Sequence, residues 1–241
     1  MTLCASLAAP LHVGIVGCSA EGAALCYRTL CAEGAARLGE HRHPPVSMHT
    51  PSLQDYVQCL ERGDLDGVAA LMLDSARRLQ AAGAEFLICP DNTVHAAFDR
   101  VREASPLPWL HIAEVVAEEA LRRGLRRVGL TGTAWLVASD VYPAALAARG
   151  IDCVRPTEAQ RLEMGRRIMD ELVPGRIEFA TVRYFQSVVE HFRDVGCDAV
   201  ILGCTEIPLV LSDANAALPT LDSTRLLARA ALDRALAGMS C

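Results

Sequence analysis

Two short polar segments follow apolar runs, and each carries a side chain that can move a proton. "CPDNTVH" (89–95) follows the run FLI and contains Asp91, and "LGCTEIP" (202–208) follows the run AVI and contains Cys204. Each apolar run is typical of a buried strand, and each polar segment of a turn that opens a helix. A carboxylate and a thiol at corresponding ends of two similar strands suit acid–base chemistry on the two faces of one small molecule.

The two groups differ in their ordinary acid–base behaviour. A thiol titrates near about 8.5 and becomes a better base where helix dipoles stabilise the thiolate. An aspartate titrates near about 3.9 and is the weaker base unless burial or a neighbouring anion raises its pKa. Each residue also has a structural interpretation: Asp91 as a helix cap that accepts from the N–H of Thr93, and Cys204 as a buried inert thiol. Cys89 is interpreted as a core residue, and as the reserve thiol if Asp91 is only a cap.

Polar residues near both segments could hold a ligand. The start of a helix offers free backbone N–H groups and the positive end of the helix dipole, which together favour a carboxylate. We therefore expect a cleft that holds a small carboxylate between two helix starts, with one potential base on each side. The candidate binding residues at these positions are Ser19, Asn92, Thr93, Thr133 and Thr205.

Short β-branched runs alternate with helical periodicity along the chain. This alternation, with continuously apolar strands, predicts an α/β fold of parallel sheets that helices cover on both faces. In such sheets the ligand lies beyond the carboxyl ends of the strands. The expected strands are 12–17, 45–50, 86–89, 109–112, 127–132, 151–154, 199–204 and 218–222, and the expected helices 20–38, 52–83, 93–103, 113–124, 134–148, 158–196 and 223–237.

The chain also repeats itself. "GIVGCS" (14–19) matches "GLTGTA" (129–134) at an offset of 115 residues, and "ICPDNT" (88–93) matches "ILGCTE" (201–206) at an offset of 113. Two motifs at nearly one spacing predict two pseudo-symmetric lobes, each a parallel sheet flanked by helices, with the active site in the cleft between them. We expect one lobe over 1–105 plus 210–241 and the other over 106–209, with the crossing near Ser105–Pro108 and the final helix returning to the first lobe.

Composition excludes several classes of protein. The 241 residues are half apolar and carry a formal net charge of −6, which argues against a nucleic-acid partner because phosphate contact needs a clustered basic face. The ten cysteines are scattered without CxxC or zinc-site spacing, which predicts reduced thiols in a cytoplasmic protein and no metal site. No apolar run is long enough to span a membrane, and the first ten residues lack the basic segment of a signal peptide.

Five segments resemble the aspartate/glutamate racemase family, whose superfamily includes hydantoin racemase, maleate isomerase and arylmalonate decarboxylase. They are "GIVGCSAEGAALCYRTL", "AGAEFLICPDNTVH", "LPWLHIAE", "VGLTGT" and "VILGCTEIPL", and they are spread along the chain from residue 14 to residue 209. The resemblance implies two pseudo-symmetric α/β lobes, assembly as a homodimer, an amino acid or similar small carboxylate as substrate, and chemistry without pyridoxal phosphate, another cofactor or a metal.

The resemblance carries over to some positions and fails at others. Cys204 matches the family's second catalytic cysteine, but the first catalytic position, usually cysteine and sometimes threonine, is Asp91 here. Glu163 lies at or beside the lysine that pairs with the substrate's side-chain carboxylate in acidic-amino-acid racemases. A glutamate there would suit a neutral or basic side chain; the alternative is a solvated charge on a helix. The positions that match residues holding the α-carboxylate are Asn92, Thr93, Thr133 and Thr205.

The sequence thus predicts an isomerase, a racemase or epimerase independent of pyridoxal phosphate, that uses Cys204 and Asp91 as opposed acid–base groups. One alternative is a decarboxylase or cis–trans isomerase of small carboxylic acids that uses the single Cys204. Another is a protein that binds a small ligand without catalysis. A dinucleotide site at "GIVGCSAEG" is disfavoured because the spacing is not GxGxxG and the next strand ends in His49 and Thr50, not in an acid. His49 and His95 receive structural roles.

Overall fold

The protein contains two four-stranded parallel sheets with the same strand order. The computed structural model describes residues 9–239. The first sheet has the order β2-β1-β3-β4 and the second the order β6-β5-β7-β8, and all pairings are parallel. The two-lobed α/β fold predicted from the internal repeat is confirmed. The strands are β1 Val13–Val16, β2 Val46–His49, β3 Phe86–Ile88, β4 Trp109–Leu110, β5 Arg127–Gly132, β6 Asp152–Val154, β7 Ala199–Gly203 and β8 Thr220–Asp222.

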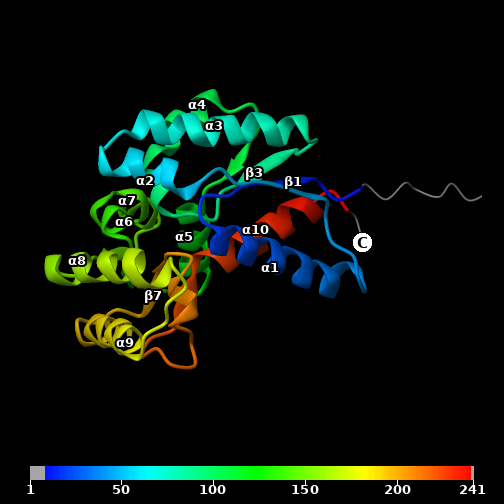
Figure 1. Ribbon diagram of the computed structural model, residues 1–241. Coiled ribbons are helices and arrows are strands. Elements are labelled where there is room, and N and C mark those ends of the chain that lie inside the picture. Colours follow the sequence, from blue (N-terminus) through cyan, green and yellow to red (C-terminus); the bar gives the residue numbers. More distant parts are fainter. Residues whose placement is uncertain (1–8, 240–241) are drawn as a thin grey trace, which may run out of the picture.

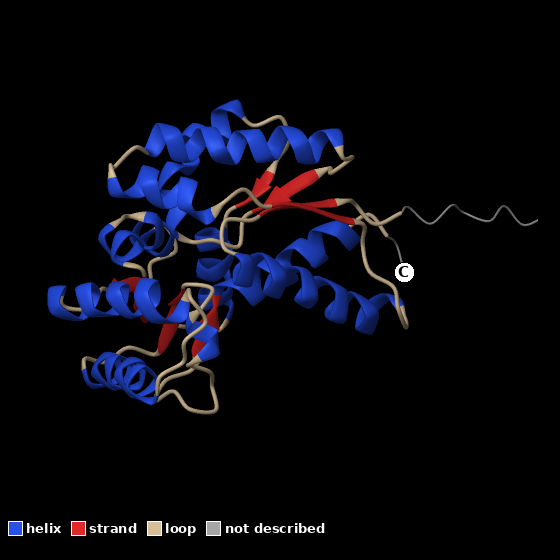
Figure 2. Ribbon diagram, in the orientation of Figure 1, coloured by secondary structure: helices blue, strands red, loops and turns tan. Residues whose placement is uncertain are grey.

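Helices follow the strands, as Figure 2 shows by colour, but several expected helices are divided. The segment 52–83 breaks at Gly63, whose φ of 67° favours glycine, and a new helix begins where Asp64 accepts from the N–H of Gly67. The segment 158–196 breaks after a π-helical turn at Ile168–Leu172, where Pro174 precedes Gly175 (φ 78°). The α-helices are α1 Ala20–Leu38, α2 Leu53–Glu61, α3 Leu65–Ala81, α4 Phe98–Ala104, α5 Ile112–Arg122, α6 Ala134–Ala138, α7 Val141–Ala147, α8 Glu158–Arg167, α9 Phe179–Asp194 and α10 Ser223–Leu236, and 3₁₀ turns occupy Thr93–Ala97 and Ile207–Leu209.

Apolar side chains on both faces of each sheet form the core. On one face of the first sheet, Ile15 of β1 and Phe86 of β3 pack with Leu227 of α10, and α1 lies alongside α10 (Figure 1). On the other face, Leu87 packs with Met72 of α3. The central strands are buried except for the exposed first residue of β5, Arg127, and are shielded from water on both sides.

Two strands fall on the other side of the predicted lobe boundaries. Strand β4 pairs with β3, so the first sheet extends to Leu110, beyond the expected crossing near Ser105–Pro108. Strand β8 pairs with β7, so Thr220–Asp222 belongs to the second sheet although 210–241 was assigned to the first lobe. The final helix does return to the first sheet, because Leu227 packs on its strands. How the chain divides into folding units stays a prediction.

The described residues also bear on the membrane and cysteine predictions. No helix within residues 9–239 is long and apolar enough to cross a bilayer. The eight cysteines in this range are free thiols. Residues 1–8, which make up most of the segment used for the signal-peptide interpretation, lie outside the described residues.

Candidate active site

Asp91 lies in the turn that follows β3 and caps the 3₁₀ turn after it. Its Oδ1 accepts from the backbone N–H of Thr93 at 3.0 Å and from that of Val94 at 3.4 Å. The backbone carbonyl of Asp91 accepts from Nδ1 of the buried His95 at 2.7 Å. Because Ile112 N–H donates to Nε2 of His95 at 3.5 Å, the ring carries its proton on Nδ1. Burial lowers the pKa of His95 well below its usual range, so this neutral histidine holds the turn and has the structural role predicted.

Asp91 can act as a base as well as a cap. Burial and the nearby charge of Glu206 raise the pKa of Asp91 to about 6, while the two backbone N–H donors oppose the rise. At pH 7 the side chain is therefore mainly a carboxylate. The cap uses only Oδ1, and no hydrogen bond from a described residue occupies Oδ2. Capping and proton transfer are thus compatible in one side chain.

Cys204 lies at the corresponding end of β7 and has an acidic partner. Its Sγ donates to Oε2 of Glu206 at 3.0 Å, and the Thr205 hydroxyl donates to the same oxygen at 2.6 Å. Cys204 and Glu206 are only 8% and 4% exposed. Burial, together with the charge and the accepted hydrogen bond of Glu206, raises the pKa of Cys204 well above its usual range. The resting side chain is a neutral thiol, which is the acid form.

Hydroxyl groups join these two turns to turns of the opposite sheet. Ser19, after β1, shares a hydrogen bond of 3.0 Å with Thr205, after β7. Thr133, after β5, shares one of 2.9 Å with Thr93, after β3. Ser19 and Thr133 also cap α1 and α6 through their side-chain oxygens. The four hydroxyl residues predicted from the sequence therefore meet in one place, in two reciprocal pairs.

The side-chain polar atoms of Asn92 have partners within the protein, and its predicted contact with a substrate stays a prediction. Its Oδ1 accepts from the Tyr142 hydroxyl at 2.6 Å, and its Nδ2 donates to Ser223 Oγ at 3.1 Å. Ser223 in turn donates to the backbone carbonyl of Leu202 in β7 at 2.8 Å. The side chain ties the Asp91 turn to α7, α10 and β7, and so fixes the placement of one site strand relative to the other.

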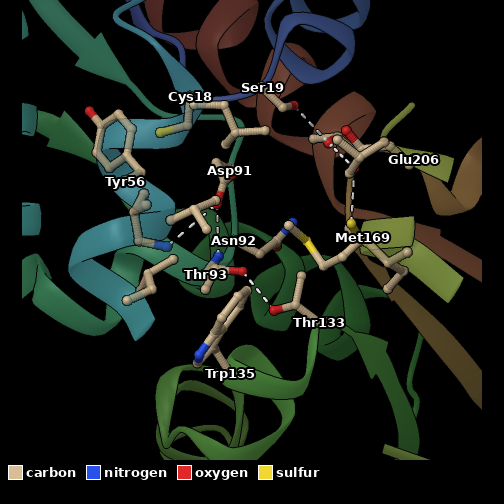
Figure 3. Close-up of a pocket in the computed structure, with 18 of the residues that line it drawn as sticks. Cys18, Ser19, Tyr56, Asp91, Asn92, Thr93, Thr133, Trp135, Met169 and Glu206 are labelled. Carbon is tan, nitrogen blue, oxygen red and sulfur yellow. Dashed lines mark hydrogen bonds between the residues drawn. The ribbon is translucent and has the colours of Figure 1, made fainter. Parts of the chain in front are cut away.

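One cleft collects these residues (Figure 3). It is narrow, with a cavity volume of about 40 Å³. Asp91 and Cys204 both line it, so the structure brings the two predicted acid–base groups together. The lining residues are Cys18, Ser19, Leu53, Tyr56, Val57, Leu60, Asp91, Asn92, Thr93, Val94, Thr133, Trp135, Ile168, Met169, Val173, Gly203, Cys204, Thr205 and Glu206.

Glu163 does not line this cleft, in contrast to the predicted contact with a substrate. It lies on α8 and accepts from Arg166 at 2.9 Å and from Arg167 at 2.7 Å. The hydrogen bond from Arg166 is the main reason that the pKa of Glu163 falls to about 2. The geometry fits the alternative interpretation, a charge on a helix surface, because both carboxylate oxygens already have cationic partners.

Several residues that line the cleft were not predicted from the sequence to do so. Glu206 stands two positions after Cys204 in "GCTE", and an acid so close to a thiol on a turn was a usable signal. Tyr56 belongs to an apolar stripe of α2, which spacing alone shows, but only the fold turns that stripe toward the cleft. Trp135 and Met169 carry no local signal of their role. Within residues 9–239 no group of three ligating side chains converges as a metal site would require.

The sequence is similar to those of known racemases. The sequence profile described as Asp/Glu/hydantoin racemase matches residues 15–231. The broad specificity amino-acid racemase RacX of Bacillus subtilis is 26% identical over 177 residues, which are 73% of this chain and 76% of that protein. A glutamate racemase of Corynebacterium kroppenstedtii is 31% identical over 145 residues, 55% of this chain and 45% of that protein.

Solved structures show the same fold. A protein from Yersinia pestis assigned to the Asp/Glu racemases superposes with a TM-score of 0.85 at 30% identity, covering 94% of this chain and 99% of that one. An aspartate racemase homologue from Pyrococcus horikoshii OT3 superposes with a TM-score of 0.79 at 27% identity, covering 93% and 98%. The whole arrangement of both sheets is thus shared with these proteins.

Proposed function

The chain belongs to the Asp/Glu/hydantoin racemase family, and we propose that it is an amino-acid racemase or epimerase whose opposed acid–base groups are Asp91 and Cys204. The observation that carries the proposal is their placement at corresponding strand ends of two sheets, in one cleft, as a resting carboxylate and a resting thiol. The names of the relatives, racemases of glutamate or of amino acids of broad specificity, support an isomerase of this kind.

Proton transfer follows from the resting forms. The Asp91 carboxylate removes the α-proton from one face of the substrate, and the Cys204 thiol delivers its proton to the other face. The products of this step are the mirror-image substrate, a protonated Asp91 and a Cys204 thiolate. Reaction in the opposite sense starts from that second arrangement, which holds the same number of protons, so the two groups titrate as a pair.

The polar turns can stabilise the negative charge that forms when the α-proton is removed. Loss of the α-proton moves negative charge onto the substrate's α-carboxylate, and prearranged donors stabilise that charge most where water is excluded. The hydroxyls of Ser19, Thr93, Thr133 and Thr205 and the N-terminus of the 19-residue helix α1 lie at this end of the cleft. These groups are proposed to bind the α-carboxylate.

Glu206 is proposed to set the protonation of the pair. Its carboxylate accepts from Cys204 and raises the pKa of both Cys204 and Asp91. This keeps the Cys204 thiol protonated at rest. It also brings the pKa of Asp91 closer to neutral pH, where a base that must also release its proton is most effective.

Neither alternative predicted from the sequence requires a base opposite Cys204. A decarboxylase or cis–trans isomerase that used Cys204 alone, or a protein that only bound its ligand, would require no base opposite the thiol. The ionised Asp91 in the cleft therefore favours two-group chemistry. Assembly as a homodimer and a cytoplasmic location stay predictions from the sequence.

The test is α-proton exchange with inversion. The purified protein is incubated in D₂O with enantiopure amino acids, the α-proton is followed by NMR, and the enantiomers are separated by chiral chromatography. We expect deuterium to enter together with the mirror-image product. Absence of exchange with every amino acid, or exchange that never inverts the centre, would contradict the proposal.

A further inference from the structure

One wall of the cleft is a continuous apolar face of α2. Leu53, Tyr56, Val57 and Leu60 all line the cleft and are spaced i, i+3, i+4 and i+7, which places them on a single side of the helix. Tyr56 is fully buried, whereas Leu53, Val57 and Leu60 are partly exposed. This stripe thus presents hydrocarbon surface to whatever occupies the cleft.

The second lobe completes the apolar lining. Trp135 of α6 and three residues of the turn after α8, Ile168, Met169 and Val173, also face the cleft. Figure 3 shows Tyr56, Trp135 and Met169 on different sides of the Asp91 turn. Among the described residues, the polar side chains that line the cleft are the hydroxyls, Asn92, the thiols, the indole N–H of Trp135 and the two acids at its reactive end.

Within residues 9–239, no basic side chain lines the cleft. The sequence contains no lysine, so every cation other than histidine is an arginine. The arginines on the neighbouring helix are already paired: Arg166 with Glu163 and Glu171, and Arg167 with Glu163. A substrate with an acidic side chain would bury that charge without a partner, near Asp91 and Glu206, and an unpaired buried charge is costly.

A substrate with a basic side chain would also lack an ion-pair partner. Among the described residues that line the cleft, the walls formed by α2, Trp135 and the turn after α8 contain no carboxylate, so a cationic group extending from the α-carbon would have no carboxylate to pair with there. The two acids that do line the cleft, Asp91 and Glu206, are engaged in the proton-transfer chemistry.

We infer that the substrates of this protein are amino acids with an uncharged, apolar side chain of branched aliphatic, thioether or aromatic type. The inference rests on the proposed racemase function and adds its substrate class. The α-carboxylate binds at the polar turns, and the side chain packs against the stripe on α2 and against Trp135 and Met169.

The test is a ranking of substrates by the unmodified protein. Leucine, methionine and phenylalanine are compared with aspartate and glutamate, and with lysine and arginine, by deuterium entry at the α-carbon and by inversion. We expect kcat/KM for the best apolar substrate to exceed that for every charged one by at least about 100-fold. This comparison needs no variant to fold.

A pair of variants on α2 tests the wall itself. Val57→Arg places a cation in the cleft, and Gln58→Arg places the same cation on the exposed neighbouring position outside it. We expect Val57→Arg to lower the apolar-to-acidic preference by at least about 10-fold and Gln58→Arg to leave it unchanged, since an opposite charge in the cleft would pair with an acidic side chain. Equal preferences in the two variants would show that the stripe does not contact the substrate's side chain.

The outcomes separate the two claims. If an acidic or a basic amino acid is the fastest substrate, the apolar class is overturned and the racemase function stands. If no amino acid exchanges its α-proton, the proposed function fails, and the substrate class fails with it.

Discussion

The turns after β3 and after β7 occupy equivalent places in the two sheets but hold their reactive groups in opposite ways. After β3, the residue two positions beyond Asp91 is Thr93, whose N–H donates to the carboxylate. After β7, the residue two positions beyond Cys204 is Glu206, whose carboxylate accepts from the thiol. One turn thus provides a donor to an acid and the other an acceptor to a thiol.

This difference affects how far each pKa moves from its ordinary value. Backbone donors limit the rise in the pKa of Asp91, which stays near about 6, whereas burial and Glu206 drive the pKa of Cys204 well upward. A duplicated backbone therefore presents a base on one side and an acid on the other. The ordinary pKa values of a carboxyl and a thiol already make Asp91 the base and Cys204 the acid, and burial and Glu206 move both pKa values upward.

The largest effect should come from removing either group. Cys204→Ala and Asp91→Asn should each lower kcat/KM for racemisation by at least about 10³-fold, because inversion needs proton transfer on both faces. Chiral chromatography measures the rate. Cys197→Ala, which removes a buried thiol outside the cleft, is the control and should keep activity near that of the unmodified protein. A Cys204→Ala protein as active as this control would remove the thiol from the mechanism.

The next largest effect is a change in stability in Asp91→Asn, which separates the helix-capping role of Asp91 from its role as a base. Asparagine preserves the cap but cannot ionise, so Asp91→Asn should remain folded. Because the pKa of Asp91 is raised in the native state, the unmodified protein loses stability as pH rises from about 4 to about 6. The variant should therefore be more stable at pH 7.5 by about 1–3 kcal/mol and lose this advantage near pH 4. Urea unfolding at both pH values measures it.

A matched control is Asp55→Asn, an exposed aspartate in the first turn of α2. Its stability should change by less than about 0.5 kcal/mol, as for most surface substitutions. If Asp91→Asn were no more stable than this control at pH 7.5, Asp91 would not be under the electrostatic pressure described.

Glu206→Gln should move the pH profile in a defined direction. The acidic limb of kcat/KM reports ionisation of Asp91 and is expected near pH 6; the alkaline limb reports loss of the Cys204 proton. Removing the charge of Glu206 lowers both pKa values, so both limbs should shift to lower pH, with a rate reduced by about 10-fold at the optimum. Limbs that stay in place would show that Glu206 does not set the protonation of the pair.

The smallest effect should come from removing the hydrogen bond between Tyr142 and Asn92, which holds the Asp91 turn in place. Tyr142→Phe removes the hydroxyl that donates to Asn92, and an unpaired buried acceptor should cost about 1–3 kcal/mol in the free energy of unfolding. Racemisation should fall by less than about 10-fold, because no group that moves a proton is lost. Tyr27→Phe on the exposed face of α1 is the control, and an equal effect of the two substitutions would contradict the role given to Asn92.

The parts of this picture that are local in the sequence could be predicted. Strand ends, hydroxyl positions and the pairing of Asp91 with Cys204 follow from short motifs and their repeat. What depends on packing could not: β4 and β8 are too short to assign to a sheet before their partners are known. The cleft-facing side of α2 is likewise set by tertiary contacts.

Charge placement was the hardest part to predict. The sequence places Glu163 near the expected substrate side chain, but Arg166 and Arg167 hold it at the surface of α8. Glu206 is only two positions from Cys204 in the sequence, but its hydrogen bond to Cys204 depends on how the turn after β7 folds. Hydrogen-bond partners of charged groups are properties of three-dimensional neighbours.

The most direct test of the central claim is deuterium exchange by the two single variants with separate enantiomers. Cys204→Ala retains the Asp91 base, so it should exchange the α-proton of one enantiomer only, with retained configuration. Asp91→Asn should exchange only the opposite enantiomer, and mainly at alkaline pH, where the thiolate forms. If both variants exchanged the same enantiomer, or if Asp91→Asn still inverted its substrate, Asp91 and Cys204 would not be opposed acid–base groups.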